Sequence, residues 1–140
     1  MRKILFTAFL LVLTDQILKV WIKTNMFLGQ EYQIFDWFII HFTENNGMAF
    51  GMEFGGAFGK ISLTLFRIVV VTVGLYYVNS IVNSKFSKGA LVALGLITGG
   101  AIGNIIDSTF YGLIFNDSYG AIASLFPENG GYAPLLHGKV

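Results

Sequence analysis

Cysteine and charge are scarce in this sequence, and both shortages exclude classes of function. None of the 140 residues is cysteine, which excludes disulfides, thiolate metal sites, a cysteine nucleophile and a cysteine-linked lipid anchor on this chain. Charged residues make up 12% of the chain, against about 25% in a typical soluble domain, while hydrophobic residues make up 54%. The formal net charge of +1 gives no argument for a nucleic-acid partner. The composition instead predicts a protein of the lipid bilayer.

Common motifs of soluble enzymes are missing as well. His41 and His137 are far apart and form no His-Glu-x-x-His pair. Neither a Gly-x-Ser-x-Gly motif nor a phosphate-binding glycine loop is present. We therefore expect no metal and no cofactor.

Three long apolar runs dominate the sequence. They cover residues 4–22, 61–82 and 89–106, and each is long enough to cross the ~30 Å hydrocarbon core of a bilayer as a helix. The chain has a length typical of one domain. We therefore predict a single membrane domain over residues 1–140, of the α-helical integral-membrane class, with three transmembrane helices.

Between the first two runs, residues 24–59 contain four acids and no lysine or arginine. The segment 34–42 is aromatic and β-branched, which is typical of a strand. The segment 43–54 offers an Asn-Asn-Gly turn followed by a second extended run. These patterns predict a small β element over about 32–58. Residues 107–140 have no further apolar run and are expected to form a loop.

The distribution of cations predicts the orientation of the chain. By the positive-inside rule, the N-terminus and the short loop before the third run lie in the cytoplasm. The β element and the loop 107–140 then lie outside, and the third run carries Asp107 to the outer leaflet. The cations that decide this orientation are Arg2, Lys3, Lys85 and Lys88.

Two ionisable residues interrupt the first run. Asp15 and Lys19 are one helical turn apart on the same face, in the favourable order of acid before base. An unpaired charge at that depth would cost several kcal/mol, so the pair is expected to face protein or water. Two interpretations stay open: a structural ion pair that fixes helix packing, or a polar group of a functional site.

The third run combines a packing face with a polar end. Gly95, Gly99 and Gly103 recur every four residues and allow another helix to approach closely. Asn104 and Asp107 are three residues apart and point the same way. An acid in or beside a membrane span is a candidate functional group. The alternative is that Asp107 only marks the helix end in the headgroup region.

Three short blocks carry a family resemblance. They are Asp15-Gln16-x-x-Lys19, Asn45-Asn46-Gly47-Met48-Ala49-Phe50 and Gly99-Gly100-Ala101-x-Gly103-Asn104-x-x-Asp107. Each block alone is a weak signal, but their order and their places relative to the apolar runs are specific. With these blocks the chain, over essentially its whole length, resembles bacterial lipoprotein signal peptidase (signal peptidase II). The family fold has four transmembrane helices and a small β-cradle on the outer face.

The resemblance also implies an activity and a site. It implies an aspartic endopeptidase of the bacterial inner membrane that removes signal peptides from prolipoproteins just before a diacylglyceryl-modified cysteine. It implies that Asp107 is one of two catalytic aspartates, and that Asp15, Lys19, Asn45 and Asn104 support or line the site. Its partners would be prolipoproteins and the lipid bilayer, and we expect a monomer.

The chain departs from the family pattern near its end. The second catalytic aspartate and the fourth helix of the family are absent, and Ser108 stands where the family often has arginine. We therefore expect a truncated chain with little or no activity by itself. Two weaker hypotheses would replace the missing acid: Asp117 as a second carboxylate, or Lys19 as a base beside a serine.

A different class of function also stays open. A non-catalytic three-helix membrane protein, such as a transporter subunit or an assembly factor, would use Asp15, Lys19 and Asp107 as structural or ion-handling groups. A second aspartate downstream would favour the peptidase.

Overall fold

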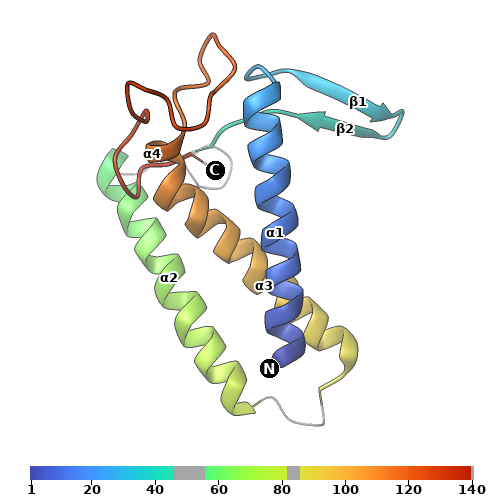
Figure 1. The fold of residues 1–140 in the computed structure, drawn as a ribbon. Helices are drawn as coiled ribbons and strands as arrows, with labels where there is room; N and C mark the ends of the chain where they lie inside the picture. The colour runs from blue at the N-terminus through green and yellow to red at the C-terminus, as the bar shows by residue number, and fades with distance from the viewer. Residues whose placement is uncertain (46–55, 82–85, 140) are drawn as a thin grey trace.

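The computed structural model describes residues 1–45, 56–81 and 86–139 (Figure 1). Three long helices account for most of it, and a two-stranded hairpin lies between the first two in the sequence. In chain order the elements are α1 (Arg2–Asn25), β1 (Glu31–Phe35), β2 (Phe38–His41), α2 (Gly56–Ile81), α3 (Lys88–Ile106), η2 (Asp107–Tyr111) and α4 (Gly112–Ile114).

Three helical stretches of the described residues are long and apolar enough to span a membrane. They are Arg2–Asn25, Phe58–Ile81 and Lys88–Ile114. Many of their large apolar side chains are exposed at the protein surface, as is expected where lipid is the surrounding solvent. The predicted class, an α-helical membrane protein with a small β element, is therefore confirmed.

The glycine face of α3 packs directly against α1. Gly95, Gly99 and Gly103 are all buried. A Cβ atom added at Gly99 would lie 3.0 Å from the carbonyl oxygen of Ala8, and one added at Gly95 would lie 2.9 Å from that of Ile4. The close helix approach predicted from the spacing is thus present, and its partner is the first helix.

The third helix continues beyond its expected end. The backbone passes from α3 through the π-helical turn η2 into α4, and it remains helical as far as Ile114. Phe110, Tyr111 and Leu113 extend the apolar pattern past the carboxylate, which favours continuation of the helix. Asp107 therefore lies within a spanning helix and not at its tip, and the predicted loop begins only after Ile114.

The β element folds back earlier than expected. The segment 34–42, predicted as one strand, is broken by a turn at Asp36 and Trp37, and that prediction is wrong. Aspartate is a frequent turn residue because its side chain can hydrogen-bond to nearby backbone. The resulting antiparallel hairpin projects sideways from the end of α1 (Figure 1). The turn predicted at residues 45–47 lies, from residue 46 onward, outside the described residues.

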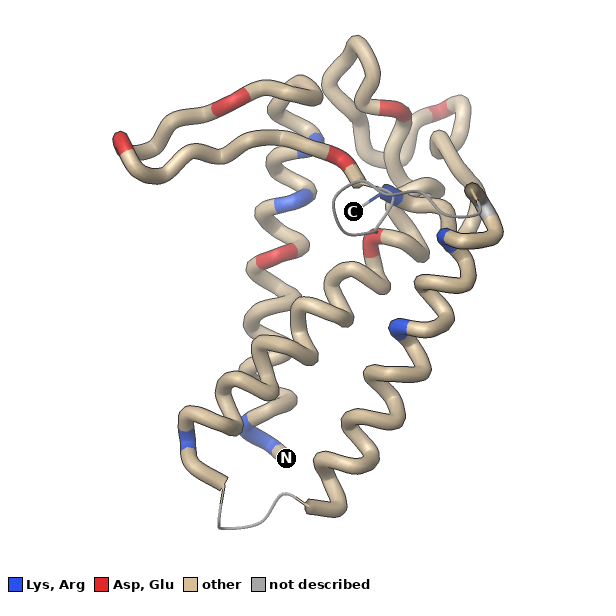
Figure 2. Tube along the Cα trace, turned by 180° about the vertical axis from the view of Figure 1, so that it is seen from behind, with Lys and Arg blue, Asp and Glu red and all other residues tan. Residues whose placement is uncertain are grey.

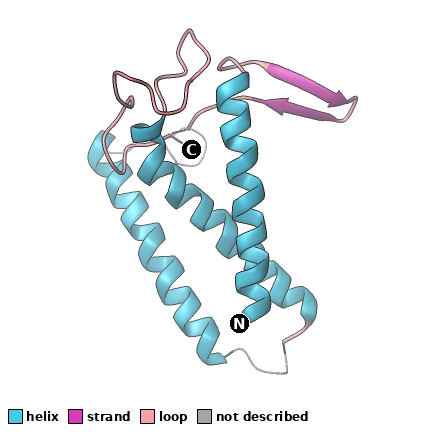
Figure 3. Cartoon of the chain, in the orientation of Figure 1, coloured by secondary structure: helices cyan, strands magenta, loops and turns pink. Residues whose placement is uncertain are grey.

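After α4 the chain forms loops at the same end of the bundle as the hairpin (Figure 3). Phe115 is fully buried and packs with Tyr111 and Ala123 in a small core. The Tyr132 amide donates a hydrogen bond to the carbonyl of Phe115 at 3.0 Å. Packing and such hydrogen bonds, more than regular secondary structure, hold these loops against the helix ends.

Among the described residues, acids lie in one half of the bundle only, whereas cations lie in both halves (Figure 2). The cations at the starts of α1 and α3 lie at the end away from the hairpin (Figure 2). The acidic residues of the described chain lie in the opposite half, toward the hairpin and the loops (Figure 2). The polar residues with candidate functions are therefore gathered in one half of the molecule.

Candidate functional site

A buried carboxylate on the third spanning helix is the centre of the site. The side chain of Asp107 is 0% exposed. Its Oδ2 pairs with Lys19 Nζ at 2.5 Å, and its Oδ1 accepts a hydrogen bond from Gln16 Nε2 at 2.8 Å. Both carboxylate oxygens are thus engaged by α1, which offsets the cost of burying the charge.

Asp15 adds a second carboxylate to the same lysine. Its Oδ2 lies 3.0 Å from Lys19 Nζ and accepts a hydrogen bond from Gln16 Nε2 at 3.1 Å. Gly103 makes room for this acid, because a Cβ atom at that position would lie 2.6 Å from Asp15 Oδ2. The glycine face therefore serves the polar site as well as the packing of the two helices.

Tyr111 fixes the orientation of the glutamine. Its hydroxyl donates a hydrogen bond to Gln16 Oε1 at 3.1 Å. With the amide oxygen engaged, the amide nitrogen of Gln16 is directed to the two carboxylates. The result is a continuous network from Tyr111 through Gln16 to Asp107, joined to Lys19 and Asp15.

The structure brings three of the five predicted site residues into direct contact. Asp15, Lys19 and Asp107 form one network, although they come from segments about ninety residues apart. Asn104 is half-buried one turn before Asp107, and among the described residues its side chain makes no hydrogen bond. Asn45 is half-buried at the edge of the described chain.

Two members of this network were not predicted as site residues. Gln16 stands inside the Asp15-Gln16-x-x-Lys19 block, so its place in a motif was a usable signal. Tyr111 lies four residues after Asp107, on the same side of a helix. Its role could not be inferred while the helix was expected to end before it.

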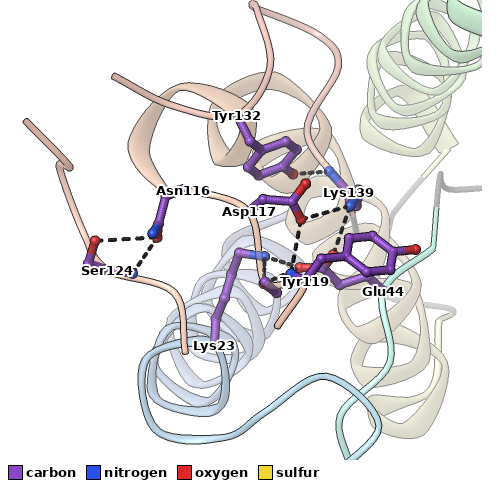
Figure 4. Close-up of polar contacts among 9 residues, drawn as sticks. Lys23, Glu44, Asn116, Asp117, Tyr119, Ser124, Tyr132 and Lys139 are labelled. Carbon is purple, nitrogen blue, oxygen red and sulfur yellow. Dashed lines mark hydrogen bonds and ion pairs between the residues drawn. The ribbon is translucent and has the colours of Figure 1, made fainter. Parts of the chain in front are cut away.

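A second polar cluster surrounds Glu44 beyond the last turn of α1 (Figure 4). The Glu44 carboxylate is 7% exposed and forms an ion pair with Lys23. It also accepts a hydrogen bond from the Ser118 hydroxyl at 2.7 Å and pairs with Lys139 Nζ at 3.1 Å. The cluster therefore joins α1, the segment after the hairpin, and two loop segments that are distant in the sequence.

Aromatic rings enclose the lysine of this cluster. Lys23 Nζ lies 5.4–5.8 Å from the ring centres of Phe42, Phe115 and Tyr132. Each ring face attracts the ammonium charge, and the attraction grows when water is excluded. Lys23 follows Lys19 by one helical turn, so its place on this edge of α1 was readable from the sequence, but its partners were not.

The charges of the cluster shift the pKa values of its members. Burial raises the pKa of Glu44, but hydrogen bonds from Lys23 and Ser118 and the nearby ammonium charges outweigh burial and hold that pKa below 4.5. Burial by itself would lower the pKa of Lys139, but the hydrogen bond and the negative charge of Glu44 outweigh burial and hold that pKa above 10.5. Burial raises the pKa of the Tyr132 hydroxyl to about 12, so it stays neutral at physiological pH.

Replacing Glu44 by glutamine is expected to lower the free energy of unfolding at neutral pH by about 2–3 kcal/mol, because Lys23 and Lys139 lose their shared carboxylate. The pKa of Glu44 is lower in the folded state than in the unfolded state. Its stabilisation is therefore present above about pH 4.5 and is lost as the pH falls through the folded pKa. Chemical unfolding of both proteins between pH 7 and pH 3 should give curves that converge in acid.

Ser118→Ala is the matched control for this experiment. It removes one hydrogen bond to Glu44 but leaves both ion pairs in place. We expect a smaller loss that keeps the acid-dependent stability of the carboxylate. A difference between wild type and E44Q that is constant from pH 7 to pH 3 would contradict the assignment.

A pocket of about 110 Å³ lies between the two clusters. Lys19 contributes to it from the Asp107 network, and Lys23, Glu44 and Lys139 contribute from the second cluster. A group bound in this pocket would contact a lysine that is already held by a buried carboxylate. The complete lining is Lys19, Ile22, Lys23, His41, Phe42, Thr43, Glu44, Tyr111 and Lys139.

Comparison with known proteins identifies the family. Residues 7–122 match the family model described as Signal peptidase (SPase) II. The chain belongs to the signal peptidase II family. The matched residues include the whole Asp107 network, as well as Glu44 of the second cluster.

Relatives in this signal peptidase II family are similar over most of the chain. A lipoprotein signal peptidase of Porphyromonas gingivalis is 49% identical over 132 residues, covering 94% of this chain and 57% of the relative. One of Amoebophilus asiaticus is 43% identical over 124 residues, covering 85% of this chain and 52% of the relative. The chain thus spans about half the length of the curated relatives it matches, and the resemblance inferred from its motifs is confirmed.

A solved structure supports the fold of this signal peptidase II family member. It is a bacterial membrane enzyme determined by the in meso method at 2.3 Å resolution. The similarity has a TM-score of 0.59 at 27% sequence identity and covers 76% of this chain and 63% of the other. The arrangement of spanning helices described above is therefore shared with a membrane enzyme.

The expectation of no metal and the roles expected of single residues stay predictions for this signal peptidase II chain. Within residues 1–45, 56–81 and 86–139, no group of three or more His, Asp or Glu side chains is placed to hold a metal ion. The catalytic role implied for Asp107, and the supporting roles implied for Asp15, Lys19, Asn45 and Asn104, are likewise predictions.

Proposed function

We propose that this chain acts as part of a prolipoprotein signal peptidase, an endopeptidase that removes the signal peptide before a lipid-modified cysteine. The observation that carries the proposal is the match of residues 7–122 to the signal peptidase II family model. The relative from Porphyromonas gingivalis that bears the name lipoprotein signal peptidase supports it. The charged network within the spanning helices also supports the proposal. Ionisable groups at such positions cost free energy and are usually functional.

The proposed chemistry needs carboxylates in two roles. Peptide hydrolysis without a covalent intermediate requires a base that activates water and an acid that protonates the leaving group. Two close carboxylates supply both, because they do not ionise together easily. Asp15 and Asp107 do not form such a pair in this structure, since the Lys19 ammonium lies between them.

For Asp107 we propose a positioning role. Its carboxylate is fully buried and both of its oxygens are engaged, so it cannot reach a water or a peptide carbonyl while Lys19 and Gln16 are bound. In this arrangement it holds Lys19 at the wall of the pocket. The catalytic role implied by the family resemblance requires that pairing to open, and the variants below separate the two roles.

The proposed orientation places the site at the outer leaflet of the bacterial inner membrane. The N-terminus and the start of α3 lie together at one end of the bundle, with the cations Arg2, Lys3 and Lys88. Cytoplasmic segments of membrane proteins are enriched in such cations. The Asp107 network lies in the other half of the molecule, near the level where a lipid-modified cysteine would hold its peptide bond. One copy of the chain supplies the whole network, in keeping with a monomer.

The test is cleavage of a synthetic prolipoprotein peptide by the native protein, purified from its own membranes and assayed by mass spectrometry. We expect a cut directly before a diacylglyceryl-cysteine and no cut before an unmodified cysteine. Cleavage that ignores the lipid, or no cleavage by protein in lipid bilayers, would overturn the proposal. The second result would favour a non-catalytic membrane protein.

Asp107→Asn in that protein is expected to reduce cleavage by about 100-fold, the scale that follows from an active-site displacement of about 1 Å. In the positioning role, Asp107→Asn loses no more activity than Lys19→Met, and the double variant Lys19→Met/Asp107→Asn loses no more than Lys19→Met alone, because Asp107 acts only through Lys19. If Asp107 itself acts on the peptide, Asp107→Asn loses more activity than Lys19→Met, and the double variant is as inactive as Asp107→Asn. Glu128→Gln, at an exposed loop acid, is the control and should retain full activity.

A further inference from the structure

The hairpin has one face made of aromatic and aliphatic side chains, with the Tyr32 hydroxyl as its one polar group. Side chains alternate between faces along a strand, and cross-strand partners share a face. Tyr32 pairs with Ile40, so alternation places Ile34 and Phe38 on the face of this pair. After the register shift in β1, Phe35 pairs with Phe38 and joins the same face. The apolar face therefore consists of Tyr32, Ile34, Phe35, Phe38 and Ile40.

The opposite face is mainly polar. It carries Glu31, Gln33, Ile39 and His41, and the Glu31 and His41 side chains lie 3.5 Å apart at the base of the hairpin. The hairpin is therefore amphipathic. The register shift produces this division, because it moves Phe35 from the polar face to the apolar one.

The tip of the hairpin is aromatic and open. Trp37 is 82% exposed, with its ring centre 5.8 Å from that of Phe35 and 5.7 Å from that of Phe38. Large apolar side chains of α1, such as Phe9 and Ile17, are exposed to a similar degree, and lipid surrounds them in a membrane. The apolar side chains of the hairpin are thus about as exposed as those of the spanning helix that contact lipid.

The hairpin is continuous with a spanning helix. α1 ends at Asn25, β1 begins at Glu31, and the hairpin leaves the end of α1 sideways (Figure 1). A segment that leaves a spanning helix in this direction runs along the bilayer boundary. Tryptophan and tyrosine favour that boundary, where their rings are buried and their polar atoms stay hydrated.

We propose that the apolar face of the hairpin docks into the headgroup region of the bilayer, and that zwitterionic lipid is a sufficient partner. Residues 24–59 contain four acids and no lysine or arginine, so anionic headgroups offer this segment no attraction. Apolar contact alone provides the anchor, while Glu31 and His41 remain in water. The anchor holds the segment that leads to Glu44 and the pocket, and it does not depend on the proposed peptidase activity.

Two single-cysteine variants test the orientation of the hairpin. The chain has no native cysteine, so one spin label can be introduced at a time. Ile34→Cys on the apolar face and Ile39→Cys on the opposite face are matched, since both replace isoleucines of similar exposure, 40% and 48%. In phosphatidylcholine nanodiscs, we expect the Ile34→Cys label to collide more with dissolved oxygen than with a water-soluble nickel complex. The Ile39→Cys label should show the reverse, and added phosphatidylglycerol should change neither.

Three results would overturn the proposal. Equal access of the nickel complex to both labels would place the hairpin in water. Protection of the Ile34→Cys label from both reagents would mean that protein, such as a second copy, covers the face. Docking that requires anionic lipid would contradict the apolar anchor.

Trp37 gives a second measurement that needs no cysteine. The chain has two tryptophans, so Trp21→Phe leaves Trp37 as the single tryptophan, whose emission can be excited selectively over that of the tyrosines. Lipids brominated near the headgroup should quench its emission more than aqueous iodide does. Preferential quenching by iodide would overturn the proposal, and the helical signal of each variant reports whether it has folded.

Discussion

Lys19→Met is expected to lower the free energy of unfolding by about 3–5 kcal/mol, the scale observed when one partner of a buried ion pair is removed. Methionine keeps most of the apolar stem of lysine, so the packing of α1 is retained and the main loss is the charge. Asp107 would then keep a buried negative charge with Gln16 as its donor on the first helix. Asp15, on the same edge of α1, would add repulsion in place of a shared cation.

Unfolding by detergent titration in mixed micelles, followed by the helical signal, measures this loss. The double variant Lys19→Met/Asp107→Asn should be more stable than the sum of the two single losses predicts, by at least about 1 kcal/mol, because the two side chains are in contact. Lys88→Met, at an exposed lysine, is the control and should change stability by less than about 0.5 kcal/mol. Equal losses for K19M and K88M would mean that the buried pair makes no net contribution.

Gly99→Ile is expected to force α1 away from α3 and to lower the free energy of unfolding by about 3 kcal/mol or more, the upper end for overpacking a tight contact. A Cβ atom at Gly99 would lie 3.0 Å from the carbonyl oxygen of Ala8 and 3.1 Å from its Cα. These are backbone atoms, so no rotation of a side chain can relieve the clash. The whole helix has to shift, and the Asp107 network shifts with it.

Gly100→Ile is the matched control for this substitution. Gly100 is the next residue of the same helix, and a Cβ atom there meets nothing within 4 Å. The two variants share the change in helix propensity and in hydrophobicity, so their difference in thermal unfolding isolates the helix contact. We expect G100I to be as stable as wild type or more stable. Equal stability of G99I and G100I would show that the close approach of the two helices does not limit stability.

Local patterns in the sequence were sufficient to predict the frame of the molecule. Spanning helices have to be long and apolar, and the periodic glycines can only mark a face of close approach. The pairing of Asp15 with Lys19 follows from their spacing of one turn, and the structure contains it. The resemblance to signal peptidase II also rested on local blocks, and the family match confirms it.

The remaining features depend on contacts that no local pattern encodes. Glu44 lies in a segment that looked merely acidic, and its partners Ser118 and Lys139 are more than seventy residues away. The hairpin turn at Asp36 was hidden inside an aromatic run, where a strand of nine residues was equally compatible with the composition. The end of the third helix was predicted too early because the charged residue Asp107 was taken as its boundary. In the structure, the Lys19 ammonium and the Gln16 amide of α1 allow this carboxylate to be buried within the helix.

The first helix links the two ends of the molecule mechanically. Near its start Ile4 is seated against Gly95, and Lys19 lies about 22 Å further along the axis at 1.5 Å per residue. Because α1 is stiff and is packed against α3 near its start, a small change in its tilt produces a larger displacement at Lys19 and Lys23. Both lysines move together. Spanning helices adjust their tilt to the thickness of the surrounding bilayer. The width of the pocket is therefore expected to change with membrane thickness. The lipid then determines the geometry of the site in addition to solvating the helices around it.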